Sequence, residues 1–136
     1  MKNELDVKEW VRFADMDVLS AKYLNEIQYP RPLEIICYHC QQASEKMLKA
    51  LMISFDCAVQ KTHDLGLLLD ILSDYVIFPE KVINAAEKLT PYGVKIRYPQ
   101  DFNIEEQHVK NALHCMNVIY DFVSDELKKQ DEHGER

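Results

Sequence analysis

The chain has 136 residues, of which 47% are hydrophobic and 29% charged, and its formal net charge is −7. One domain with an ordinary hydrophobic core is expected at this length. The negative net charge argues against non-specific nucleic-acid binding over the whole surface, because proteins that bind in this way have basic surfaces. No apolar run approaches the ~20 residues that span a membrane, and the N-terminal stretch has no signal-peptide core. We therefore expect a cytoplasmic protein that does not enter membranes and whose four cysteines are reduced.

Two long amphipathic helices are predicted in the first half of the chain. The first covers residues 5–28, and its single tryptophan, Trp10, is expected to anchor the core or a dimer interface. The second covers residues 32–55 and begins at Pro32, which suits a first helical turn because its missing N–H has no partner there. The short connection between the two predicts antiparallel neighbours.

The second predicted helix has two adjacent apolar rows and an opposite polar face. That face carries His39, Gln42, Glu45, Lys46 and Lys49. Glu45 and Lys49 are spaced as an i,i+4 pair, which contributes ~0.3 kcal/mol when exposed. Gln42 and Lys46 lie one turn apart and are candidates for binding the same ligand. The alternative is a solvated face or a polar network inside the bundle.

Two short helices are predicted next, over residues 65–75 and 79–89. Thr62 is expected to be the N-cap of the first, and the second begins at a proline. Residues 90–103 hold two prolines and a glycine without a sustained period, so they predict an ordered loop. The sequence therefore predicts an all-α protein with three long helices and two shorter ones.

The last predicted helix begins after Asn103 as its N-cap, with Glu106 in the capping-box position, and continues to about Lys129. Residues 1–130 are expected to form a single domain. Residues 131–136 are expected to be a frayed polar tail.

The loop before the last helix supplies the first candidate site. Arg97 can bind a phosphate with two parallel hydrogen bonds, Tyr98 can stack on a base, and Lys95 adds a positive charge. The structural alternative is that Arg97 pairs with a carboxylate such as Asp101 and fixes the loop, with Tyr98 packed beneath it.

A second candidate site is the pair His63 and Asp64. An imidazole beside a carboxylate at a helix start can bind a substrate oxygen or orient a proton transfer, and the alternative is helix capping. No metal site or cofactor is expected. Cys37 and Cys40 have C-x-x-C spacing and His114-Cys115 could add ligands, but the motif lies inside a helix rather than on a zinc knuckle.

Three segments together resemble the HEPN domain family of small prokaryotic helical proteins: C-Y-H-C-Q-Q-A-S-E-K-M-L-K-A-L, K-T-H-D-L and L-T-P-Y-G-V-K-I-R-Y-P. The resemblance implies an up-and-down four-helix bundle with an additional short helix and an ordered R-Y-P loop. It also implies a homodimer, in a toxin–antitoxin-like or stress-response setting, that is encoded beside a minimal nucleotidyltransferase.

Many members of that family are metal-independent ribonucleases in which an arginine precedes a histidine by four to six residues. Here ten residues separate Arg97 from His108, and seven separate Arg31 from His39, so that motif is absent. We therefore expect a protein without catalytic activity, the homodimeric nucleotide- or RNA-binding partner of a minimal nucleotidyltransferase. The alternative is a ribonuclease toxin with a divergent site, in which Arg97 acts with His108 or His63.

Overall fold

Five α-helices and one 3₁₀ turn form the protein in a computed structural model that describes residues 2–27, 30–94 and 103–134. The three long helices are α1 (Lys2–Glu26), α2 (Leu33–Ser54) and α5 (Glu106–Gly134). The short elements are α3 (Leu65–Leu72), α4 (Glu80–Leu89) and the 3₁₀ turn η1 (Thr90–Gly93). These described residues contain no strand, so the all-α prediction is confirmed.

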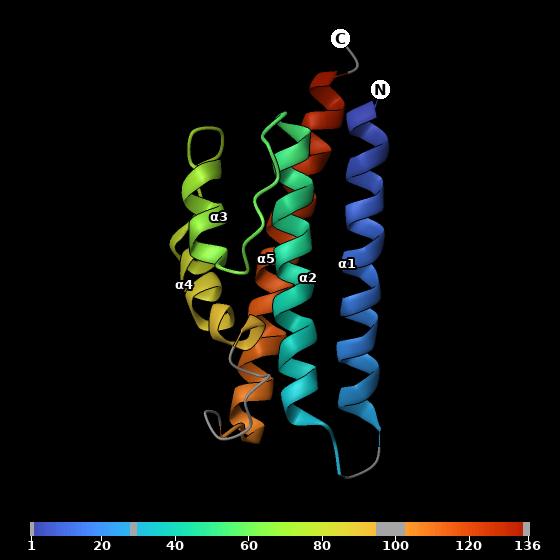
Figure 1. Ribbon diagram of the computed structural model, residues 1–136, viewed down its shortest axis with the longest axis vertical. Coiled ribbons are helices and arrows are strands. Elements are labelled where there is room, and N and C mark those ends of the chain that lie inside the picture. Colours follow the sequence, from blue (N-terminus) through green and yellow to red (C-terminus); the bar gives the residue numbers. More distant parts are fainter. Residues whose placement is uncertain (1, 28–29, 95–102, 135–136) are drawn as a thin grey trace.

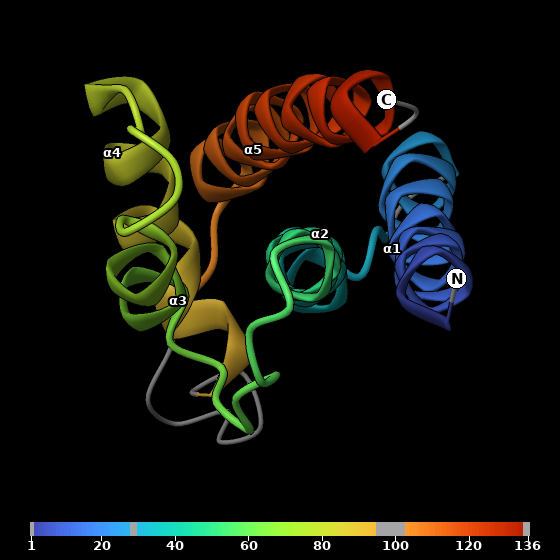
Figure 2. The same cartoon turned by 90° about the horizontal axis from the view of Figure 1, so that it is seen from above.

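The helices are arranged around α2 (Figures 1 and 2). α1 lies along one side of α2, α5 along another, and α3 with α4 on the side away from α1. The helices α1, α2, α4 and α5 alternate in direction along the chain, as expected for an up-and-down bundle, and α3 is the additional short helix. The N-terminal end of α1 and the C-terminal end of α5 lie at the same end of the molecule (Figure 1).

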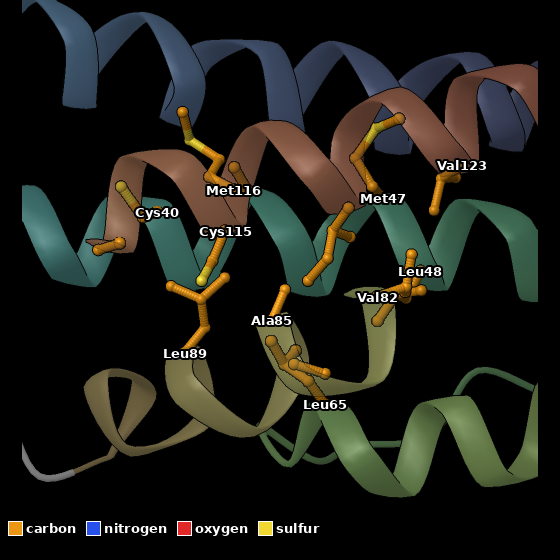
Figure 3. Packing of buried hydrophobic residues seen from close by; sticks show 14 of the residues in the cluster. Cys40, Met47, Leu48, Leu65, Val82, Ala85, Leu89, Cys115, Met116 and Val123 are labelled. Atoms are coloured by element: carbon orange, nitrogen blue, oxygen red, sulfur yellow. The ribbon is translucent and has the colours of Figure 1, made fainter. Parts of the chain in front are cut away.

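Apolar side chains from all five helices form one core. Leu89 points from α4 toward Cys115 of α5, and Val82 and Ala85 project from the same side of α4 (Figure 3). Each fully buried leucine contributes about 2 kcal/mol by leaving water. This packing fixes α2 in the interior of the bundle.

The burial of α2 decides between the two readings of its polar face. A solvated face is one of the sequence-based alternatives for Gln42, Glu45 and Lys49, yet all three residues are buried. α1, α5 and the segment that contains α3 and η1 contact α2 from three directions, so few of its residues remain in contact with water. The side chains of Gln42, Glu45 and Lys49 therefore lie inside the fold, while His39 and Lys46 are partly exposed.

Two predicted helix starts are wrong. Asp64, and not Thr62, is the N-cap of α3: its carboxylate accepts a hydrogen bond from the N–H of Leu67 at 3.3 Å. Thr62 instead accepts one from the N–H of Asp64 at 3.1 Å. α5 starts at Glu106, later than an N-cap at Asn103 requires, and continues past Lys129. The difference at α3 arises because Thr62 and Asp64 are both favourable N-cap residues.

Candidate functional site

Four polar residues meet where α2 faces the start of α3, and we call them the glutamate cluster: Gln41, Glu45, Lys49 and His63. The first three lie one helical turn apart on α2, and His63 precedes the N-cap of α3. Lys49 Nζ lies 2.8 Å from Oε2 of Glu45, and Nδ1 of His63 lies 2.9 Å from Oε1. Gln41 Nε2 donates to the same Oε1 at 3.1 Å. Three donors thus converge on one carboxylate.

The electrostatics of the cluster keep Glu45 ionised. Only 4% of its surface is exposed, and burial alone would raise the pKa of its carboxyl group. Hydrogen bonds from Lys49, His63 and Gln41, and the positive charge of Lys49, outweigh burial and lower the pKa of Glu45 below its usual value. The cluster therefore contains a buried carboxylate that stays negative at neutral pH.

His63 is the member of the cluster that reaches water, since 45% of its side chain is exposed. An ionised carboxylate only accepts hydrogen bonds, so the bond to Glu45 selects the tautomer that carries its proton on Nδ1. In the neutral form of that tautomer, Nε2 on the opposite edge of the ring carries the lone pair. An imidazole held in this way can accept a proton or a hydrogen bond from a ligand.

The glutamate cluster also contacts the turn η1. Gln41 Nε2 donates to the main-chain carbonyl of His63 at 3.0 Å, and a Cβ added at Gly93 would lie 2.5 Å from Cδ of Gln41. The N–H of Leu65 donates to Oγ1 of Thr90 at 3.1 Å. Thr90 and Gly93 are the ends of η1, so the segment around His63 and the turn that precedes residues 95–102 are held together.

A second set of polar residues connects α1 to α2, and we call it the aspartate cluster: Asp17, His39 and Lys46. Asp17 is buried on α1, and its two carboxylate oxygens contact Nδ1 of His39 at 2.8 Å and Nζ of Lys46 at 2.5 Å. The cluster therefore joins the two helices by charge-assisted hydrogen bonds.

The structure places the predicted site residues of α2 and α3 in these contacts. Lys46 belongs to the aspartate cluster, and Gln42 donates to Oε1 of Gln41 at 2.7 Å. Asp64 caps α3, while His63 belongs to the glutamate cluster. Gln42 and Lys46 therefore face different partners and do not converge on one open site.

His108 lies apart from both clusters. Its Nδ1 accepts a hydrogen bond from the main-chain N–H of Glu105 at 2.9 Å, at the start of α5. The ring thus satisfies one of the donors that a helix start leaves unpaired. The remaining predicted residues, Lys95, Arg97 and Tyr98, together with Asp101, lie outside the described residues.

The cysteines behave as core residues. Burial raises the pKa of the Cys37 thiol to about 12 and raises that of Cys40 still further. A thiol must lose its proton to bind a metal or act as a nucleophile, and burial opposes that loss. Within the described ranges, no three His, Cys, Asp or Glu side chains are grouped as metal ligands would be.

Two members of the clusters were not singled out from the sequence: Gln41 and Asp17. Gln41 begins the row of polar residues that continues with Glu45 and Lys49, each four positions on, and this spacing was available in the sequence. Asp17 gave no such signal, because its partners are 22 and 29 positions away on another helix.

The sequence matches the HEPN domain family over residues 7–128, and the chain therefore belongs to this family. Proteins of this family are often dimeric. A search of curated proteins gave no significant match. In the described parts of the chain, no helix is long and apolar enough to cross a membrane.

Three solved structures are similar to the chain. TT1696 from Thermus thermophilus is 26% identical, with a TM-score of 0.75, over 88% of this chain and 96% of that one. ST0689, an archaeal HEPN homologue, is 20% identical with a TM-score of 0.69 and the same coverage. A HEPN domain protein (tm0613) from Thermotoga maritima is 18% identical with a TM-score of 0.56, over 94% of this chain and 98% of that one. The last two support the fold alone.

Proposed function

We propose that the protein is a HEPN-domain subunit without catalytic activity that binds a nucleotide or an RNA end. It acts as the homodimeric partner of a minimal nucleotidyltransferase in a toxin–antitoxin-like or stress-response pair. The observation that supports binding is the link from His63 through Gln41 to Gly93. Through this link the main chain at His63, whose imidazole is half-exposed, is held near the turn that leads, two residues later in the sequence, into the segment with Lys95, Arg97 and Tyr98.

The chemistry of these side chains suits a phosphorylated ligand. The imidazole can hydrogen-bond to a ribose hydroxyl or a base edge, and the cations and Tyr98 suit phosphates and a base face. A local site of this kind is compatible with the overall charge of −7, because a nucleotide or a strand end needs few contacts. The pairing with a nucleotidyltransferase rests on family membership.

Ribonuclease activity is the alternative, and one observation favours it. Glu45 orients His63 as a carboxylate orients a catalytic histidine, with Nε2 directed away from the carboxylate. His108 supports this alternative less well, because its Nδ1 is engaged by the main chain of Glu105.

One set of variants tests both functions. The purified protein is mixed with ATP in calorimetry, and with a fluorescent single-stranded RNA in anisotropy and in a gel assay without divalent metal. The variants are His63→Gln and Arg97→Ala. His114→Gln is the control, since His114 is exposed on α5 and belongs to neither cluster.

The proposal predicts intact RNA, together with ATP or RNA binding that weakens at least about fivefold in His63→Gln and Arg97→Ala but not in His114→Gln. RNA that is cleaved by the wild-type protein and spared by His63→Gln establishes the ribonuclease instead. Absence of both binding and cleavage contradicts both functions.

The partner is tested by examining the neighbouring genes for a minimal nucleotidyltransferase and co-expressing this chain with it. Size-exclusion chromatography with light scattering should give a complex that contains two copies of this chain. A monomer mass for the isolated protein at working concentration contradicts the dimer. Two proteins that elute separately contradict the pairing.

A further inference from the structure

A groove of about 690 Å³ opens between α3 and α4, the two helices that lie farthest from α1 (Figure 2). Its apolar wall comes from both helices and from the connection between them: Leu67, Leu69, Val76, Ile77, Phe78 and Ile83. Its size falls within the ~300–1,000 Å³ that is typical of binding pockets. The groove lies outside both polar clusters.

Part of this apolar wall is in contact with water. Ile77 is 93% exposed, and Leu67 and Ile83 are each more than one third exposed. Single exposed apolar side chains are ordinary, whereas several around one groove mark an interaction surface. Ile77 lies on the connection between the helices, where nothing in the described fold requires an isoleucine for packing.

The rest of the groove is acidic. Asp64, Asp70 and Glu87 line it, and among the described residues that line the groove there is no lysine or arginine. On α4, helical spacing places Glu87 one turn after Ile83, so the two share a face. Lys81 and Lys88 of the same helix are spaced to point away from that face. The groove therefore combines exposed apolar surface with three carboxylates.

The three carboxylates limit the kinds of molecule that can bind in the groove. Phosphates of a nucleic acid and an anionic lipid surface would be repelled by the three carboxylates. A second copy of the chain carries a net charge of −7 and would add further negative charge. A segment that is apolar on one side and basic on the other can contact both the apolar wall and the three carboxylates.

We propose that the groove between α3 and α4 binds a cationic amphipathic helix of a partner protein. Apolar side chains of that helix would lie against Leu67, Ile77 and Ile83, and its lysines or arginines would pair with Asp70 and Glu87. His63 is not among the described residues that line the groove, so this docking site and the part of the proposed nucleotide site at His63 can be tested separately.

The test uses a fluorescent synthetic peptide of about 18 residues, which is long enough for five helical turns. Its leucines are spaced to form one face of the helix and its lysines to form the opposite face. Two control peptides have the same composition in scrambled order, or glutamate in place of lysine. Binding is followed by anisotropy, and the contact surface is mapped by ¹⁵N chemical shifts. The protein variants are Ile77→Lys and the double change Asp70→Lys with Glu87→Lys.

A matched control changes the net charge equally at another surface: Asp121→Lys with Asp125→Lys, both exposed and one turn apart on α5. We expect shifts confined to α3, α4 and their connection. We also expect affinity to fall at least about tenfold in the groove variants and less than about twofold in the α5 control. All the substituted side chains are exposed, so each variant should keep the fold, which the ¹⁵N spectrum verifies.

Equal binding of the scrambled peptide, or an equal loss in the α5 control, would show that only the overall negative charge attracts the peptide and would overturn the proposal. Shifts located elsewhere would do the same. Binding of the glutamate peptide, or conversion of a dimer to a monomer by Ile77→Lys, would assign the groove to a different occupant.

Discussion

Nδ1 of His63 lies 2.9 Å from Oε1 of Glu45, although 18 positions separate the two residues in the sequence. This contact connects the interior of the bundle to its surface, because Glu45 is buried and His63 is half-exposed. It also gives both residues a structural role that holds whether or not His63 contacts a ligand. Stability and binding measurements can therefore separate the two roles.

Replacement of Glu45 by glutamine should destabilise the protein strongly. The side chain keeps its shape, but the buried ammonium group of Lys49 loses its counter-charge. We expect the free energy of unfolding to fall by about 3 kcal/mol, as measured by urea denaturation. Glu87→Gln, at an exposed position, is the control and should change it by less than about 0.5 kcal/mol. Equal effects in the two variants would show that the buried pair adds nothing to stability.

The protonation of Glu45 should contribute to the loss of stability at low pH. Its folded-state pKa is lower than the ordinary value of 4.5, so the unfolded chain binds more protons in that range. The stabilisation that ionised Glu45 provides is therefore complete above the pKa of the unfolded chain and is lost as the pH falls through the pKa of the folded state. Urea midpoints measured from neutral pH down to about pH 3 should fall less steeply in Glu45→Gln than in the wild type. If the urea midpoints of the two proteins fall equally with pH, the lowered pKa of Glu45 is contradicted.

Gly93→Ala should destabilise the fold, because the new Cβ would lie 2.5 Å from the buried side chain of Gln41. That side chain is held by Glu45 and by the carbonyl of His63, so it cannot move without losing hydrogen bonds. The expected loss is about 1–3 kcal/mol. Thermal or urea unfolding measures it.

Gly66→Ala is the matched control for this prediction. Its Cβ would approach only Oδ1 of Asp64, at 3.3 Å, and alanine favours a helix over glycine by about 1 kcal/mol. The variant should be as stable as the wild type or more so. A similar loss at both positions would mean that the contact between Gly93 and Gln41 is not the cause.

The aspartate cluster predicts coupling between α1 and α2. Asp17→Asn and Lys46→Met should each destabilise the protein, and the double variant should be less destabilised than the sum, with a coupling energy of about 1 kcal/mol or more. Urea denaturation of the wild type, the two single variants and the double variant gives the free energies of unfolding from which the coupling energy is calculated. Additive effects would indicate that the ion pair contributes nothing beyond its separate side chains.

The helices could be predicted from the sequence because local signals agree. Apolar spacing, the prolines before α2 and α4, and the scarcity of glycine all indicate helices close to those observed. The resemblance to the HEPN family narrowed the fold class further, and the family match covers residues 7–128. The start of α3 was harder, because Thr62 and Asp64 can both cap a helix.

The polar clusters could be predicted only in part. The pair Glu45 and Lys49 follows from spacing along one helix, but its burial depends on neighbours that the spacing does not reveal. The contacts from Asp17 to Lys46, and from His63 to Glu45, require the relative positions of separate elements. The ligand roles assigned to Lys95, Arg97, Tyr98 and His63 remain predictions.

The first and last helices bring both ends of the chain to one end of the bundle (Figure 1). α5 has 29 residues and begins at the opposite end, so roughly 40 Å separates its start from the termini. A fluorescent label, an affinity tag or a surface tether attached at either terminus would therefore stand well away from the first turn of α5. Immobilised protein can thus be probed at that end of the bundle without steric obstruction from its own anchor.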